Sequence, residues 1–146
     1  MDRHAWIDER LRQVPIFEGL SKKQLRQISG LMTRIDQPAG TILIEEGRIG
    51  NEFFIVLEGK VEVRHGDQVI ATPGPGEFFG EIALLDNRPR TATVTVKEPV
   101  VVEVLNRREF ASLLAQAPEL SQEIMATMAR RLASGGDDAA NRRPPT

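Results

Sequence analysis

A chain of 146 residues is long enough to bury a hydrophobic core and too short for two ordinary domains. Because 40% of its residues are hydrophobic and 27% are charged, we expect a globular protein, and the absence of cysteine excludes disulfides, thiolate metal sites and a cysteine nucleophile. A formal net charge of -2 argues against a surface built to grip nucleic acid, so any phosphate that the protein binds should belong to a small molecule.

The sequence carries no pattern typical of export or of membrane insertion. The N-terminus is charged and lacks the apolar stretch of a signal peptide. Apolar runs of the length that spans a bilayer, roughly 18 residues, are absent as well. We therefore expect a cytoplasmic protein without membrane association.

The N-terminal part of the chain predicts helices. Apolar residues at near-helical spacing among charged ones indicate a short amphipathic helix over residues 2–13. Ser21 and Gln24 have the spacing of a capping box, which predicts that a second helix begins there. Helices are therefore expected within residues 1–32.

From residue 33 the apolar pattern changes to the alternation typical of β-strands. Short segments rich in Val, Ile and Phe are separated by glycine and proline, as in the turn sequences at residues 38–40, 47–50, 65–67 and 73–76. About eight short strands with such frequent turns predict a small barrel or jelly roll.

After residue 105 the spacing of apolar residues becomes helical again. Asn106 and Glu109 match a second capping box, and residues 107–134 are expected to form C-terminal helices. An apolar stripe in the last helix must cover either the barrel mouth or another protomer. The stripe consists of Leu120, Ile124, Met128 and Leu132. The polar residues 135–146 have too little apolar content to fold, so we expect a disordered tail.

One short stretch inside the strand region carries the most distinctive chemistry. Gly80 lets backbone N–H groups approach an anion closely, and Arg90 offers a planar cationic fork that matches a phosphate. Glu81 supplies an acceptor for a ribose hydroxyl. Together with the apolar turn at residues 82–85, these two charges predict a cradle for a small anion.

The sequence of residues 79–96, Phe-Gly-Glu-Ile-Ala-Leu followed by Arg-Thr-Ala-Thr-Val, resembles the phosphate-binding cassette of the cyclic nucleotide-binding domain family. This family occurs in catabolite activator proteins, cAMP-dependent kinase regulatory subunits and cyclic nucleotide-gated channels. A second stretch typical of the family lies at residues 43–59, where Arg48 replaces the small polar or acidic residue usual after Gly47. The resemblance extends over residues 14–132.

The resemblance implies an α+β, mainly β fold, an antiparallel β-roll or double-stranded jelly-roll barrel with helices at both ends. It implies a binding domain over residues 1–134, with the β-roll at 33–106 and the cassette at 79–94. It also implies a switch, in which the helix over residues 119–134 closes on the ligand and signals to a partner protein or to a second copy.

The resemblance implies cAMP as the ligand, with cGMP as the alternative, and no cofactor. Arg90 and the N–H groups around Ala83 and Thr91 would hold the cyclic phosphate, and Gly80 and Glu81 would hold the ribose. The base pocket would involve Ile82, Val61, Val63, Arg130 and Arg131.

Several of these residues also have a purely structural interpretation. Arg90 could be a surface arginine paired with Asp86 or Glu81, and Thr91 a β-branched residue that opens a strand. The two valines suit a strand core. The two arginines of the last helix could be solvated charges that favour the helix dipole.

Competing classes of function lack their residues in this sequence. The histidines, His4 and His65, show no paired ligand spacing, so we expect neither a metal site nor catalysis. Hydrolase and phosphotransferase motifs are absent. The polar residues after Leu132 are too few for a helix-turn-helix, so no direct DNA binding is expected. A ligand-free scaffold and a fragment of a cAMP-responsive transcription regulator remain alternatives.

Overall fold

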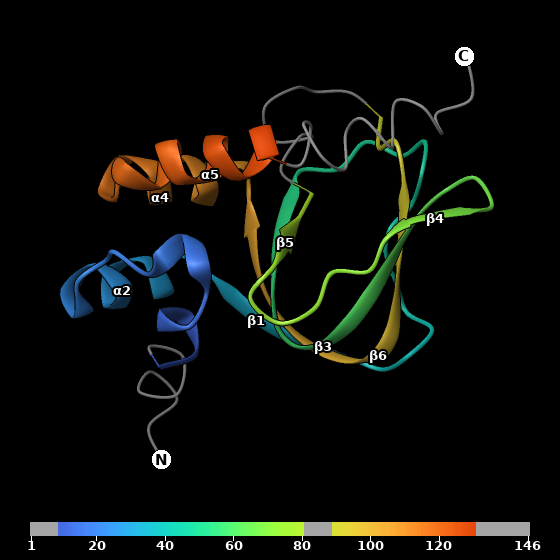
Figure 1. The fold of residues 1–146 in the computed structure, drawn as a ribbon, viewed down its shortest axis with the longest axis horizontal. Coiled ribbons are helices and arrows are strands. Elements are labelled where there is room, and N and C mark those ends of the chain that lie inside the picture. The colour runs from blue at the N-terminus through green and yellow to red at the C-terminus, as the bar shows by residue number, and fades with distance from the viewer. Residues whose placement is uncertain (1–8, 81–88, 131–146) are drawn as a thin grey trace.

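Helices gather at one end of a β-roll in the computed structural model, which describes residues 9–80 and 89–130 (Figure 1). Residues 9–12 are helical. The other helical elements are the 3-10 turn η1 (Pro15–Phe17) and the α-helices α2 (Lys22–Ser29), α4 (Arg107–Gln116) and α5 (Glu119–Arg130). The strands are β1 (Thr33–Gln37), β2 (Ile42–Ile44), β3 (Glu52–His65), β4 (Gln68–Ala71), β5 (Phe78–Phe79) and β6 (Thr93–Asn106).

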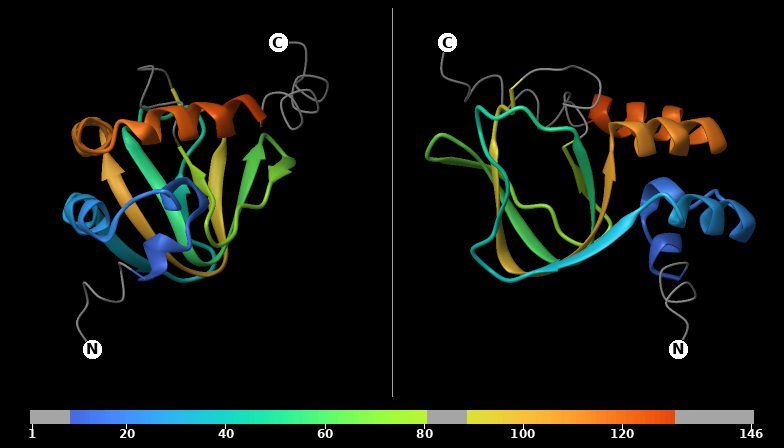
Figure 2. Two further views of the ribbon diagram at one scale, coloured as in Figure 1. Left: turned by 60° about the vertical axis from the view of Figure 1, so that its left-hand side comes forward. Right: turned by 180° about the vertical axis from the view of Figure 1, so that it is seen from behind.

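The strands form one antiparallel sheet, with the order β1-β6-β3-β4, in which β2 also pairs with β6 and β5 with β3. The two long strands, β3 and β6, pair along most of their length, from Glu52 opposite Asn106 to Arg64 opposite Thr93. The sheet curls into a roll beside the helices, as the two views of Figure 2 show. The mainly β fold expected from the sequence is confirmed.

Both predicted capping boxes are confirmed. The side chain of Ser21 accepts a hydrogen bond from the N–H of Gln24 at 3.1 Å, and the Gln24 side chain accepts from the N–H of Ser21 at 3.0 Å. Asn106 and Glu109 make the same reciprocal pair at 2.8 Å in each direction. Such caps satisfy N–H groups that have no partner inside the helix, and each contributes about 1 kcal/mol.

The prediction that the roll consists only of short strands is wrong, because β3 and β6 each run for 14 residues. Gly59, which separates two apolar segments in the sequence, lies within β3, where the pairing with β6 shifts its register. Its φ of +86° and its close approach to the carbonyl of Pro99 suit only glycine, because a Cβ would overlap that oxygen. Here glycine marks a β-bulge rather than a turn.

Strand alternation divides the hydrophobic core into two clusters. Phe53, Ile55 and Leu57 of β3 face the helices, where they pack with residues such as Phe17 and Phe110. The intervening residues face the inside of the roll, together with the buried valines of β6. The second cluster consists of Ile44, Phe54, Val56, Val61, Phe79, Val94, Val96, Val100 and Val102. Val56 and Val61 share a side although they are five positions apart, because the bulge shifts the alternation.

The apolar stripe of the last helix packs, in its first half, on the helical cluster of its own chain. Leu120 and Ile124 are 1% and 5% exposed, within the cluster that includes Phe17 and Leu113. The prediction that this stripe covers the barrel mouth or another protomer is therefore wrong for these two positions. Leu132 lies outside the described residues.

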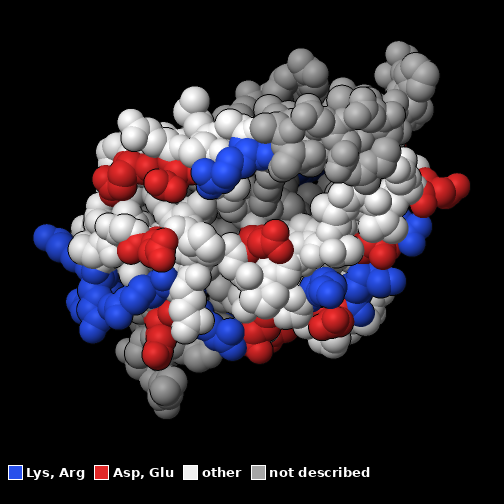
Figure 3. Space-filling view, viewed as in Figure 1, with Lys and Arg blue, Asp and Glu red and all other residues white. Residues whose placement is uncertain are grey.

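Acidic and basic side chains are spread over both the helices and the roll on the face in Figure 3. Such a mixture does not form the continuous basic stripe that is typical of nucleic-acid binding. Among the helices within residues 9–80 and 89–130, none is long and apolar enough to cross a membrane.

Candidate functional site

The backbone of Arg90 is held by the turn that follows β2. The N–H of Arg90 donates to the carbonyl oxygen of Arg48 at 2.8 Å, and the carbonyl oxygen of Arg90 accepts from the N–H of Gly47 at 2.8 Å. Because a trans peptide group is planar, the N–H of Thr91 points opposite to the Arg90 carbonyl and hence away from Gly47. The turn therefore fixes the direction of a backbone donor next to Arg90.

The guanidinium of Arg90 is buried between two strand ends. Its side chain is 6% exposed, its Nη2 donates to the carbonyl oxygen of Glu52 at 2.8 Å, and its Nη1 donates to the carbonyl oxygen of Gly80 at 3.2 Å. The carboxylate of Glu52 lies 4.0 Å from Nη2. A buried charge is costly unless it is hydrogen-bonded and paired, and these contacts offset that cost. The planar fork is thus held in a fixed position next to Gly80.

Two glycines make room for this guanidinium. A Cβ on Gly50 would lie 2.6 Å from Nε of Arg90, which is closer than a real contact allows. Gly80 has a φ of +88°, and a Cβ there would lie 2.8 Å from the Glu52 carbonyl oxygen and 3.3 Å from Nη1 of Arg90. Both positions therefore require glycine for the arginine to lie where it does.

The structure brings together the two predicted residues Gly80 and Arg90, through a direct hydrogen bond. Thr91 follows Arg90 and is exposed. Four of the predicted site residues lie outside the described residues, namely Glu81, Ile82, Ala83 and Arg131. Their roles stay predictions.

The described candidates for the base pocket lie in two separate places. Val61 is fully buried inside the roll, and Val63 packs half-buried against the same cluster. Arg130 is exposed at the end of α5, where its Nη2 donates to Oγ1 of Thr127 at 3.1 Å. A core-packing role for Val61 is therefore visible, and contact of these three residues with a base stays a prediction.

The charged residues Glu62 and Arg64 of β3 alternate with Val61 and Val63, so they face away from the inside of the roll. On this outer side, Lys97 of β6 joins them. Nε of Arg64 donates to Oε1 of Glu62 at 2.6 Å, and Nζ of Lys97 lies 3.7 Å from Oε2 of Glu62. The hydrogen bond from Arg64 lowers the pKa of Glu62, and the charges of Arg64 and Lys97 add to this shift. Glu62 is thus ionised at neutral pH and engaged with its own neighbours.

Sequence analysis missed Gly50 and Glu52 as parts of this site. Gly50 was assigned only to a turn, although it lies in the upstream stretch that resembles the family. Glu52 contributes chiefly its carbonyl oxygen, a group that every residue has and that leaves no signal in a sequence. The signal available in the sequence was that Gly50 and Gly80, the two residues that approach the Arg90 side chain closely, are both glycine.

The described part of the site combines a cationic fork with the backbone N–H of Thr91, groups that suit a small anion. Within residues 9–80 and 89–130, no three His, Cys, Asp or Glu side chains are arranged to bind a metal ion. His65 lies at the end of β3, and His4 is outside the described residues. The cationic fork of Arg90 is the part of the described site that is suited to an anion.

Comparison with known proteins gives one family. The family model described as "Cyclic nucleotide-binding domain" matches residues 35–117. A cAMP-dependent protein kinase regulatory subunit of Schizosaccharomyces pombe is 32% identical over 137 residues, which cover 93% of this chain and 33% of that protein. A CRP-like cAMP-activated global transcriptional regulator of Mycobacterium tuberculosis is 27% identical over 140 residues, 92% of this chain and 62% of the regulator. The chain thus spans only part of the length of both relatives.

A solved structure, PKAR CBD2 bound to Sp-2Cl-cAMPS, has a TM-score of 0.75 to this chain at 27% identity. The match covers 92% of this chain and 95% of that one. The β-roll with its helices is therefore shared along nearly the whole of both chains.

Proposed function

We propose that this chain, which belongs to the cyclic nucleotide-binding domain family, is a regulatory module that binds cAMP in the site around Arg90. The binding domain extends over residues 1–134 in this proposal. Its role is to bind a ligand and to pass on that event, rather than to catalyse a reaction. A related regulatory domain that carries a cAMP analogue supports the choice of ligand.

The observation that carries this proposal is the buried guanidinium of Arg90. It is fixed between the carbonyls of Glu52 and Gly80, and Gly50 and Gly80 leave room for it. A guanidinium held by backbone carbonyls is in position before the ligand arrives, and its planar fork matches the geometry of a phosphate. Each charge-assisted hydrogen bond to the phosphate is worth about 1.5–3 kcal/mol.

The other roles follow the family pattern. The N–H groups of Ala83 and Thr91 would donate to the cyclic phosphate. Gly80 and Glu81 would contact the ribose, with the Glu81 carboxylate accepting from the 2′-hydroxyl. The presence of Thr91 does not indicate whether the base is adenine or guanine. The preference for cAMP over cGMP therefore has to be measured by titration.

Titration calorimetry with cAMP and cGMP side by side tests the proposal. We expect cAMP to bind more tightly, and 2′-deoxy-cAMP to bind roughly tenfold more weakly than cAMP, because the deoxy compound cannot donate to Glu81. Linear AMP serves as the control for the cyclic phosphate. A chain that gives neither heat nor a shift in melting temperature with any of the four would be a ligand-free scaffold of the same fold.

We further propose that ligand binding moves α5. Leu120 and Ile124 anchor this helix in the core, whereas Met125 is 68% exposed, so a partner protein or second copy would contact the exposed side. Binding shifts a helix only if the ligand has different affinities for its two positions. We expect hydrogen exchange of backbone amides in α5 to slow when cAMP is added. Exchange that is identical with and without cAMP would leave a binding module without this switch.

A further inference from the structure

His65 links the β3–β4 hairpin to the residue that follows Arg90. Its Nδ1 lies 2.8 Å from the carbonyl oxygen of Thr91. A carbonyl oxygen can only accept, so a hydrogen bond here requires a proton on Nδ1, in the neutral or the charged form of the ring. The imidazole therefore donates to the backbone of the predicted phosphate-binding segment.

Glu46 connects the same two segments from the turn after β2. Its Oε1 accepts from the N–H of Gly66 at 3.0 Å, and its Oε2 lies 3.7 Å from Nδ1 of His65. Its own N–H donates to Oγ1 of Thr93 at 3.0 Å. The turn, the hairpin and the start of β6 are thus joined at Glu46, through its carboxylate to the hairpin and through its N–H to Thr93.

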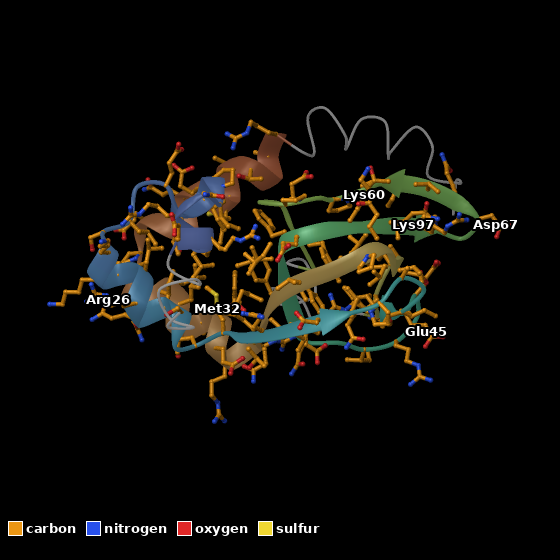
Figure 4. The ribbon with its side chains drawn as sticks, turned by 90° about the horizontal axis from the view of Figure 1, so that it is seen from below. Arg26, Met32, Glu45, Lys60, Asp67 and Lys97 are labelled. Atoms are coloured by element: carbon orange, nitrogen blue, oxygen red, sulfur yellow. The ribbon has the colours of Figure 1, made fainter. Side chains whose placement is uncertain are left out.

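These contacts lie at one end of the roll. Figure 4 labels Glu45, which precedes Glu46 in the chain, and Asp67, which follows Gly66. Both lie near Lys97, at the end of the roll opposite the helical end where Arg26 and Met32 lie. The helical core therefore lies away from this junction, where the hydrogen bonds of Glu46 and His65 join the segments.

Both peptide groups that flank the α-carbon of Thr91 are held by such bonds. The group before it is fixed where Gly47 donates to the Arg90 carbonyl at 2.8 Å. The group after it is fixed where His65 binds the Thr91 carbonyl. With both groups held, the N–H of Thr91 keeps one orientation relative to the guanidinium of Arg90.

We propose that His65 is a positioning residue of the cyclic nucleotide site, which orients Thr91 for the phosphate by holding its carbonyl oxygen. His65 acts through Thr91 and does not itself touch the ligand. The inference rests on the proposed function, since it names a further determinant of affinity at the same site. Preorganised donors bind more tightly because ligand binding need not order them.

Calorimetry with cAMP on His65→Ala and His65→Asn tests this role in the full chain. We expect His65→Ala to bind cAMP about fivefold more weakly, the loss typical of one hydrogen bond. His65→Asn should recover most of the affinity, because its amide N–H₂ takes the place of Nδ1–H. Gln68→Ala is the matched control, since Gln68 is exposed and pairs with His65 across the hairpin, and its affinity should be unchanged.

Melting temperatures without ligand verify that each variant is folded. Folded His65→Ala with wild-type affinity, or His65→Asn as weak as His65→Ala, overturns the inference and leaves the proposed function intact. Wild-type protein that binds neither cAMP nor cGMP overturns both. In the unmodified protein, proton–nitrogen correlation spectra of the imidazole should show a proton on Nδ1, and a bare Nδ1 overturns the inference even if the variants do not fold.

Discussion

Replacing Arg90 with alanine is expected to weaken cAMP binding by on the order of 100-fold. The loss of one charge-assisted hydrogen bond to the phosphate costs about 1.5–3 kcal/mol, and 100-fold corresponds to about 2.7 kcal/mol, within that range. Arg90→Lys should lose much of the same affinity, because an ammonium group keeps the charge but cannot form the planar fork. Titration calorimetry on the purified variants measures both effects.

Arg90→Ala should still fold, with a lower melting temperature in the absence of ligand. The part-buried carbonyls of Glu52 and Gly80 lose their guanidinium donors, and each hydrogen bond lost costs about 0.5–1.5 kcal/mol. Gly50→Ala is the matched variant, because it retains the charge but places a Cβ 2.6 Å from Nε and so displaces the guanidinium. Wild-type affinity in folded Arg90→Ala would remove Arg90 from the site.

The largest effect on folding is expected for Gly59→Ala, which should lower the free energy of unfolding by about 3 kcal/mol or more. An alanine at a φ of +86° is strained by about 1–2 kcal/mol, and overlap with the Pro99 carbonyl adds a packing cost of about 1–3 kcal/mol. The overlap lies in the middle of the β3–β6 pairing, so relief requires the two longest strands to separate locally. Urea unfolding measures the loss.

Gly40→Ala separates the two causes. Gly40 has a φ of +94°, close to that of Gly59, but a Cβ there meets no atom within 4 Å. It should therefore show only the backbone strain, about 1–2 kcal/mol. If the free energy of unfolding fell equally in the two variants, the close approach of Pro99 would not contribute to the cost of Gly59→Ala.

Local patterns predicted the local structure of this chain. The capping boxes at Ser21 and Asn106 depend on residues three positions apart, so the sequence contains both partners. The sequence did not reveal the bulge at Gly59, because glycine is equally suited to a turn and to a bulge. Gly59 is required because the carbonyl of Pro99 approaches it closely in the pairing of β3 with β6. Pro99 lies far along the chain, and sequence periodicity does not specify which strands pair.

The same limit applies to the helix stripe and to the site. Helical spacing shows that Leu120 and Ile124 share a face, but not that the face packs on their own chain. Gly80 and Arg90 were predicted together because the family pattern contains both. The backbone carbonyl of Glu52 and the imidazole of His65 were not, since each acts through a contact between segments that only the folded chain brings together.

A crystal structure with bound cAMP tests the central claim most directly. We predict that the cyclic phosphate lies within hydrogen-bond distance of the Arg90 guanidinium and of the Thr91 N–H, with the ribose next to Gly80. Crystals soaked in saturating cAMP that show no nucleotide at Arg90, or show it bound elsewhere, would contradict the account.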